Sequence, residues 1–196
     1  MKNVYLYYYN DYQKILHIIK EKKTLKDVYI DKDYDLYILS NKDRELKIIL
    51  FKSKKIMSII CEKYRDIVSL NIIDSVTKIN LLDKRLFNNI FELGVSNNLC
   101  KIVVDIDIIG DEVELVELNG LNLLNLDIIH DFEIQDINSN TNLKSYSFQP
   151  YGYKYLISIK SINKIEFNKR YSTEDIIIIV EKLTRLFGGD ENNING

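Results

Sequence analysis

The chain has 196 residues, with 27 lysines and arginines against 29 aspartates and glutamates and a formal net charge of −2. The lysines are scattered among acids, which argues against the basic surface that proteins use to bind nucleic-acid phosphates. No apolar run reaches the length of a membrane span, and the first residues do not form a signal peptide. We therefore expect no nucleic-acid or membrane partner and a cytoplasmic location, in a bacterium or in a host cell.

Composition also indicates the source and the state of the thiols. The chain has no Ala or Trp and one Pro, and it is rich in Ile, Asn and Lys. This pattern is typical of AT-rich codons and predicts a low-GC bacterium, its phage or a large DNA virus. Cys61 and Cys100 lie far apart without a metal-binding spacing, so we expect reduced, buried thiols. The length fits one domain over residues 1–189, followed by a flexible tail at 190–196.

The N-terminal region predicts a strand and then a helix. Residues 4–9 read as a strand, and Asn10 or Asp11 can cap a helix that runs to about Lys23. Its apolar positions recur every three or four residues: Tyr12, Ile15, Leu16 and Ile19. His17 lies beside this stripe, and we expect a partly buried packing histidine.

The next segment predicts short strands and a hairpin. Residues 28–30 and 36–39 read as strands, and residues 46–51 and 55–61 form a hairpin around Lys52-Ser53-Lys54. Lys47 lies just inside this hairpin, after Glu45. A second amphipathic helix follows and ends near Gly94, with apolar positions Leu82, Leu86, Ile90 and Leu93.

Residues 102–119 form the most distinctive stretch, because acids interrupt a strand pattern at regular spacing. Asp105 and Asp107 share the strand face opposite to the isoleucines and valine at even positions. A three-residue loop would place Asp105 opposite Glu117 and gather Asn119 on the same face. A two-residue loop would put Glu117 opposite Val104 on the apolar face. Burial favours the first register, since the second buries an unpaired carboxylate.

Directly opposed carboxylates repel each other, so this register needs an offsetting partner. A divalent cation is the simplest one, and Mg²⁺ accepts carboxylate and amide oxygens together with water and phosphate. The hairpin therefore predicts a metal site formed by Asp105, Glu117 and Asn119. The alternative is an exposed acidic sheet face whose side chains are solvated.

The C-terminal part predicts further mixed structure. His130 is flanked by Asp127 and Asp131, which indicates a surface ion cluster more than a catalytic base. Residues 138–142 read as a polar loop and residues 153–162 as a strand. Residues 172–175, with the sequence Ser-Thr-Glu-Asp, predict a capping box that opens a last, deeply buried helix ended by two glycines at 188–189. The order of elements predicts an α+β fold with a mostly antiparallel sheet and flanking helices.

Two motifs together resemble a known superfamily. Glu45-Leu46-Lys47 in a hairpin, then a helix, then Asp105 and the Glu117-Leu-Asn119 element resemble the C-terminal lobe of the ATP-grasp superfamily over residues 45–120. The likeness is greatest to small divergent members, which include ATP-dependent peptide-type ligases and the assembly chaperone of eukaryotic translation initiation factor 2. Only forty-four residues precede Glu45, so the resemblance implies an ATP-grasp-like fold reduced at its N-terminus.

The resemblance implies a cofactor site. Asp105, Glu117 and Asn119 would hold Mg²⁺ on ATP, with Asp105 and Asn119 also contacting the nucleotide. Lys47 would be the catalytic, phosphate-facing residue where the family has Arg, a substitution that keeps the charge and loses bidentate geometry. The activity implied is an ATP-dependent carboxylate–amine ligase that acts through an acylphosphate.

The sequence leaves open whether the chain is an enzyme. The alternative is a catalytically inactive viral, phage or bacterial binding or assembly protein that keeps the fold and contacts a peptide or protein partner.

Overall fold

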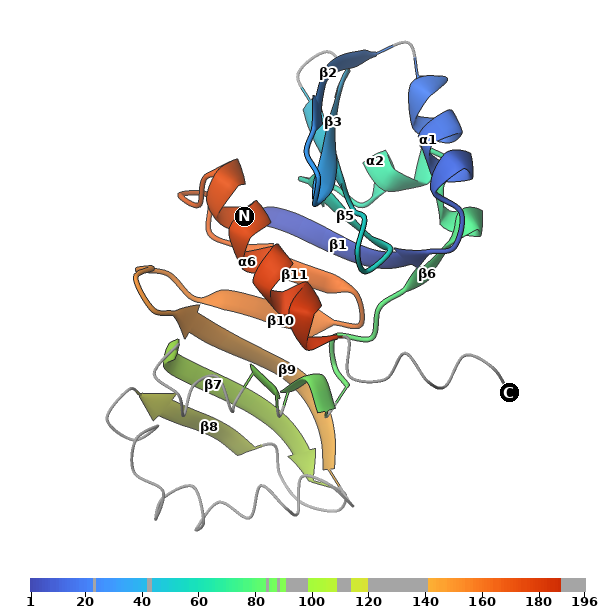
Figure 1. Ribbon diagram of the computed structural model, residues 1–196. Coiled ribbons are helices and arrows are strands. Elements are labelled where there is room, and N and C mark those ends of the chain that lie inside the picture. The colour runs from blue at the N-terminus through green and yellow to red at the C-terminus, as the bar shows by residue number, and fades with distance from the viewer. Residues whose placement is uncertain are drawn as a thin grey trace. The chain divides into compact units, whose positions relative to one another are not determined.

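The structure is a computed structural model that describes residues 1–22, 24–41, 44–83, 85–87, 89–90, 99–108, 114–119 and 141–187 (Figure 1). At residues 41, 44, 99–108, 114–119 and 141–143 the description concerns the backbone. The described chain is α+β with a mostly antiparallel sheet, as predicted. We predicted one domain over residues 1–189. The chain contains two compact units, Met1–Ile79 with Lys169–Gly196 and Asn80–Asn168, and each is described by itself.

The first unit contains the strands β1 (Lys2–Tyr9), β2 (Leu25–Ile30), β3 (Tyr34–Asn41), β4 (Arg44–Phe51), β5 (Ile56–Cys61) and β6 (Val76–Lys78). Its helices are α1 (Tyr12–Lys20), α2 (Arg65–Val68), the 3-10 helix η1 (Ile73–Ser75) and α6 (Thr173–Leu186). The sheet order is β2-β3-β4-β5-β1, and β6 also pairs with β1. The described strands of this unit pair in antiparallel fashion.

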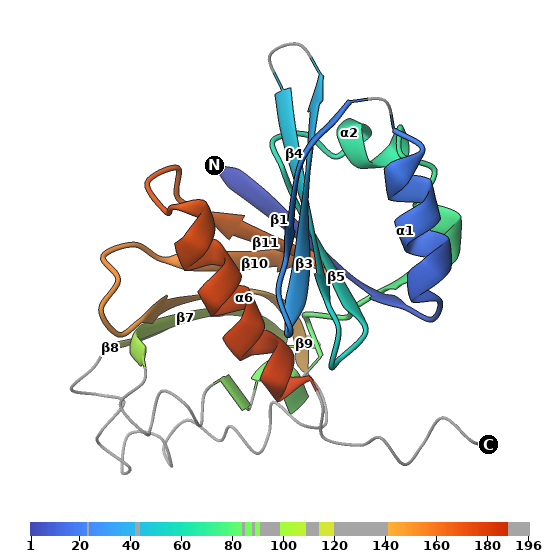
Figure 2. The ribbon, with the colours of Figure 1, turned by 45° about the horizontal axis from the view of Figure 1, so that its top comes forward.

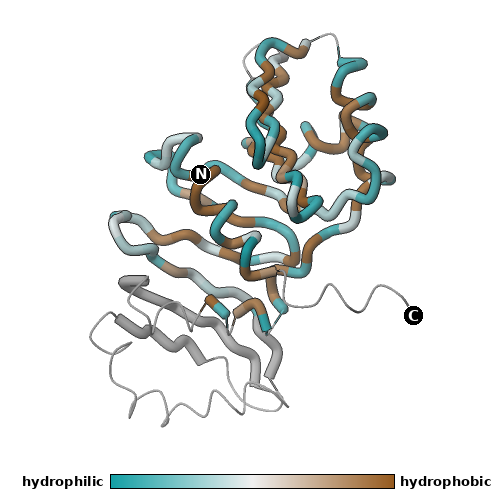
Figure 3. Tube along the Cα trace, in the orientation of Figure 1, coloured by the Kyte–Doolittle hydropathy of each residue, from teal (hydrophilic) through white to brown (hydrophobic). Residues whose placement is uncertain are grey.

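One face of this sheet packs against α1, α2 and η1. The alternation of apolar and polar residues along its strands can be followed in Figure 3. The apolar side chains on this face are Tyr5, Tyr7, Tyr9, Tyr37, Leu39, Leu46, Ile48, Leu50, Met57, Ile59 and Cys61. Ile15 and Ile19 of α1, Ile67 of α2, and Leu70 and Ile72 after α2 complete the cluster. Burial of apolar surface on this scale is the main source of a domain's stability.

The helix α6 lies on the other face of the same sheet (Figure 2). Its predicted capping box is present, since Ser172 accepts from the backbone N–H of Asp175 and the Asp175 side chain accepts from Ser172. The apolar side of the helix is buried through Ile176, Ile177, Ile179, Val180 and Leu183. The sheet is therefore covered by helices on both faces.

The helix α1 follows its prediction except at its C-terminus. Asp11 is the N-cap and accepts from the backbone N–H of Lys14, and the helix ends at Lys20, before the predicted Lys23. Ile15 and Ile19 are buried as predicted. The prediction for His17 was wrong, because its side chain is 73% exposed, with Nε2 3.1 Å from Glu21 Oε1.

The second unit contains β7 (Leu99–Ile108), β8 (Glu114–Asn119), β9 (Thr141–Pro150), β10 (Ile157–Ser161) and β11 (Lys164–Phe167), in the order β11-β10-β9-β7-β8. Residues 85–87 and 89–90 are helical, within the predicted second amphipathic helix. Phe87 lies 5.3 Å from the ring of Tyr146, whose hydroxyl donates to the backbone oxygen of Leu81 at 2.8 Å. These contacts lie in the core of the unit.

Two predictions in this unit were wrong. The predicted polar loop at 138–142 overlaps the start of β9, and residues 153–162 are not one strand, because β10 begins at Ile157. Five predictions concern residues outside the described part of the chain: those on Leu93, Gly94, the 120–140 segment with its histidine cluster, the glycines at 188–189 and the tail. Within the part of the chain described, no helix is long and apolar enough to cross a membrane.

Candidate functional site

The predicted metal site lies on the hairpin of β7 and β8, and its register differs from the prediction by two residues. Asp105 pairs with Leu115, and Glu117 pairs with Val103. The prediction that Asp105 is opposite Glu117 was therefore wrong. The observed pairs are centred on residue 110, whereas the predicted pair is centred on residue 111, and moving the centre by one residue shifts the pairing by one full side-chain repeat.

The same side chains share a sheet face as in the prediction, because a shift by two residues leaves odd-numbered residues of β7 opposite odd-numbered residues of β8. Asn119 pairs with Lys101 and Glu117 with Val103, so Asp105, Glu117 and Asn119 occupy positions of the same parity. Asp105 and Glu117 are diagonal neighbours, for which repulsion between like charges is weaker than for a directly opposed pair. The repulsion between Asp105 and Glu117, from which we predicted a cation, is therefore weaker than in the predicted register.

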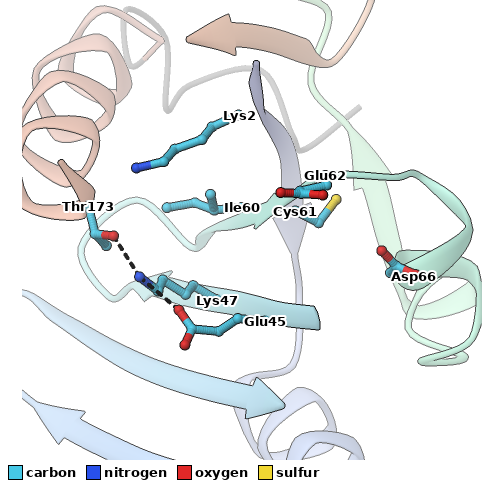
Figure 4. A pocket seen from close by; sticks show the side chains of 8 residues that line it. All are labelled: Lys2, Glu45, Lys47, Ile60, Cys61, Glu62, Asp66 and Thr173. Atoms are coloured by element: carbon cyan, nitrogen blue, oxygen red, sulfur yellow. Dashed lines mark hydrogen bonds and ion pairs between the residues drawn. The ribbon is translucent and has the colours of Figure 1, made fainter. Parts of the chain in front are cut away.

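Lys47, the predicted phosphate-facing residue, lies in the other unit and lines a pocket of about 250 Å³ (Figure 4). Its Nζ is 2.9 Å from Glu45 Oε1 and donates to Thr173 Oγ1 at 2.6 Å. These contacts tie β4 to the first turn of α6. Because the ammonium is already paired with a carboxylate, less of its charge is available to a phosphate.

The same pocket is mixed in charge. Two lysines and three carboxylates are among the eight residues that line it, as Figure 4 shows. The second lysine, Lys2, donates to the backbone oxygen of Tyr171 at 2.5 Å. Cys61 is a buried thiol, as predicted, whereas the side chain of Cys100 is not among the described residues. This lining favours internal ion pairing over recognition of an anion.

A second cluster, which sequence reasoning missed, surrounds a buried carboxylate. Asp35 on β3 is 1% exposed and shares the sheet face of Tyr37. Tyr12 at the start of α1 donates its hydroxyl to Asp35 Oδ2. Lys52 Nζ lies 2.8 Å from Asp35 Oδ1, which accepts no well-aligned hydrogen bond within the described chain. Lys52 also donates to the backbone oxygen of Asp31 at 2.5 Å.

The tyrosines of this cluster remain protonated donors through the neutral range. Burial, followed by the hydrogen bond to Asp35, raises the pKa of Tyr12 far above its ordinary value. Burial, with a contribution from the negative charge of Asp35, raises the pKa of Tyr9 to about 12. Burial is also the main cause that raises the pKa of Tyr37. The carboxylate is therefore held by a neutral phenol and a lysine, an arrangement that fixes the position of the lysine.

A signal for this cluster is present in the sequence. Asp35, Tyr37 and Leu39 alternate along one strand, and the last two are apolar residues of the buried face. A carboxylate in such a series has to be paired, because an isolated buried charge is very costly. Placing the predicted strand at residues 36–39 left Asp35 outside it and hid the pattern.

The edge strand β2 is the third feature with functional potential. It forms the end of the sheet in its unit, and Val28, Tyr29 and Ile30 are 46%, 54% and 71% exposed. Its first half carries the charges of Lys26 and Asp27 and a register irregularity between residues 25 and 27. Charges and bulges are devices that protect sheet edges from pairing, and the second half of β2 has neither.

Within the residues whose side chains are described, no group of three or more His, Cys, Asp or Glu side chains could hold a metal ion. The three predicted metal ligands lie outside that set, because only the backbone of β7 and β8 is described. Comparison with known proteins leaves the family open, since neither a family model nor a curated protein matches this sequence.

Proposed function

We propose that this chain is a binding protein that acts by pairing the open edge of β2 with an extended segment of a protein partner. The observation that carries the proposal is the run of exposed apolar residues Val28–Ile30 on an edge strand. Addition of a strand to such an edge satisfies backbone donors and acceptors and gives affinity, while the side chains at alternate positions give specificity.

The charges around this run favour a different protein over a second copy of the chain. In two-fold antiparallel pairing, one residue lies opposite its own copy. Centring the pair on Tyr29 would oppose Asp27 with Asp31, and centring it on Ile30 would oppose Asp27 with Asp33. Like charges directly opposite each other destabilise a sheet.

The third possible centre for a pair of β2 strands, Val28, is no more favourable. Centring the pair on Val28 would oppose Lys26 with Ile30 and would include the irregularity between residues 25 and 27. A partner segment with its own sequence avoids each of these conflicts. We therefore assign the edge to an extended segment with apolar side chains at alternate positions.

Selection from a displayed library of random peptides tests this proposal. The recovered peptides should bind the wild type and lose at least about ten-fold in affinity to Ile30→Lys, because an edge lysine blocks strand pairing. Ile162→Lys is the matched control, since Ile162 is 54% exposed in the other unit. Peptides that bind Ile30→Lys as tightly as the wild type would contradict the proposal. A concentration-dependent dimer lost in Ile30→Lys would assign the edge to a second copy.

A second candidate function is binding of Mg²⁺ with ATP, in the manner of the ATP-grasp-like ligase that the resemblance implies. The shared parity of Asp105, Glu117 and Asn119 supports it. A ligand at about 100 times its Kd would stabilise the fold by about 2.7 kcal/mol.

The melting temperature in Mg²⁺ with ATP tests this candidate. We expect a rise that needs both components, that shrinks in Asp105→Asn and Glu117→Gln, and that persists in Asp127→Asn. Because Asp105 and Glu117 are not directly opposed, relief of repulsion in the unliganded variants should be small. An unchanged melting temperature at millimolar Mg-ATP would exclude nucleotide binding at the hairpin.

A further inference from the structure

A pocket of about 380 Å³ opens beside the buried carboxylate of Asp35. Its lining comes from the end of β1, the start of α1 and the turn between β4 and β5, through Tyr9, Asn10, Tyr12, Lys52 and Lys55. The volume lies within the range of small-molecule sites in proteins, which is roughly 300–1,000 Å³. The pocket belongs wholly to one unit and is separate from the β2 edge and from the Lys47 pocket.

Lys52 is held in a fixed position at this pocket. Its ammonium contacts Asp35 Oδ1 at 2.8 Å and the backbone oxygen of Asp31 at 2.5 Å. An ammonium carries three donors, and the contact with the Asp31 oxygen is a hydrogen bond whereas the contact with Asp35 is an ion pair without a well-aligned hydrogen bond, so at least one N–H remains for a molecule in the pocket. The buried carboxylate thus fixes the position of the Lys52 ammonium. It also takes up part of the lysine's charge, as Glu45 does for Lys47, so Lys52 would act mainly as a hydrogen-bond donor.

Lys55 occupies an unusual backbone conformation at the same pocket. Its φ is 50°, in the left-handed region, and its carbonyl accepts from the Tyr9 N–H at 2.9 Å. Glycine and asparagine adopt this region at lower cost than a lysine. Backbone strain of this kind concentrates at ligand-binding positions, where the side chain itself is needed.

We propose that this pocket binds a phosphorylated small molecule through Lys52, Lys55 and the side-chain amide of Asn10. Lysine ammoniums act as point charges that suit a phosphate, whereas carboxylates are better matched by the planar fork of arginine, which this pocket lacks. The phosphate does not occupy the N-terminus of α1, because the Asp11 carboxylate caps it by accepting from the Lys14 N–H at 3.0 Å.

Titration with inorganic phosphate and with phenyl phosphate, followed by two-dimensional NMR of the labelled protein at constant ionic strength, tests the assignment. We expect saturable shifts at the amides of residues 9–12 and 52–55 without Mg²⁺, and weaker or no shifts with benzoate. Vesicles containing phosphatidic acid distinguish a lipid headgroup from a free phosphate, because only binding to a vesicle would slow the tumbling of the protein and broaden its amide signals. Equal shifts with benzoate, or no shifts with either phosphate, would overturn the proposal.

A pair of variants in the same turn makes the test specific. Lys55→Asn removes the ammonium and relieves the left-handed backbone, so we expect phosphate affinity to fall about five-fold or more while the urea midpoint stays the same or rises. Lys54→Asn makes the same charge change at a residue that does not line the pocket, and its affinity should stay within about two-fold of wild type. Equal loss in both variants would show general attraction to a basic turn and would overturn the site.

Discussion

Replacing Lys52 with Met isolates the part that the Asp35 cluster plays in stability. The substitution removes the ammonium 2.8 Å from Asp35 Oδ1 and keeps most of the apolar stem. The carboxylate, with 1% of the residue exposed, would keep the Tyr12 hydroxyl as its hydrogen-bond donor among the described side chains. In the variant, the buried Asp35 carboxylate would lack both water and the lysine that balances its charge.

The expected loss follows from the exposure of the two partners. Removing one member of a fully buried ion pair costs about 3–5 kcal/mol. The Lys52 side chain is 34% exposed and the Asp35 side chain 2%, so water already weakens the pair from the lysine end. We therefore expect Lys52→Met to lower the free energy of unfolding by about 2–3 kcal/mol. In an Asp35→Asn background, the same change should cost about 1–2 kcal/mol less.

Urea unfolding at neutral pH measures these values, followed by circular dichroism and by tyrosine fluorescence, because the chain has 14 tyrosines and no tryptophan. Lys54→Met is the control, since it removes a lysine from the same turn without touching Asp35. A loss in Lys52→Met no greater than in this control would refute the role assigned to the ion pair. Additive costs in the double variant with Asp35→Asn would refute the coupling.

Three further outcomes test individual parts of the fold. Ser172→Ala should cost about 1 kcal/mol in urea unfolding, because it removes the acceptor of the α6 capping box, whereas Ser172→Gly should cost less. Tyr146→Phe should cost about 1–2 kcal/mol by the same assay, since it leaves the buried Leu81 carbonyl without its donor. The hydrogen bond from Lys164 holds the pKa of Glu166 below 4.5, so the stabilisation by the ionised Glu166 is present above pH 4.5 and is lost as pH falls through the lowered pKa. Glu166→Gln should therefore lose less stability than the wild type between pH 5 and about pH 3. An equal loss of stability in both proteins over this range would contradict the prediction.

The parts of the fold that were predictable carry strong local signals. The α6 helix begins with a capping box and continues with a buried apolar side, and both features depend on neighbouring residues. The hairpin of β4 and β5 is marked by two apolar runs around a polar turn. By contrast, β9 was missed because its aromatic residues, Tyr146 and Phe148, alternate with serines in an asparagine-rich context that reads as a loop.

The candidate sites were less predictable, because they depend on contacts between distant residues. The register of β7 and β8 depends on the residue about which the pairing is centred as well as on alternation, and alternation alone fixes the parity but not the partner. Asp35 and Lys52 meet only because β3 and β4 pair and bring two turns together. The exposure of the β2 edge follows from the order of strands in the sheet, which sequence periodicity does not give.

Amide hydrogen exchange on β2 shows directly whether this strand is the binding surface. With a peptide from the library selection bound, we expect slower exchange for amides within Val28–Ile30, because a new strand would satisfy the donors on this open edge. The amides of the turn at Ile162, an exposed apolar site in the other unit, should exchange as in the free protein. Unchanged exchange at Val28–Ile30 with the peptide bound would contradict the assignment of this edge as the binding surface.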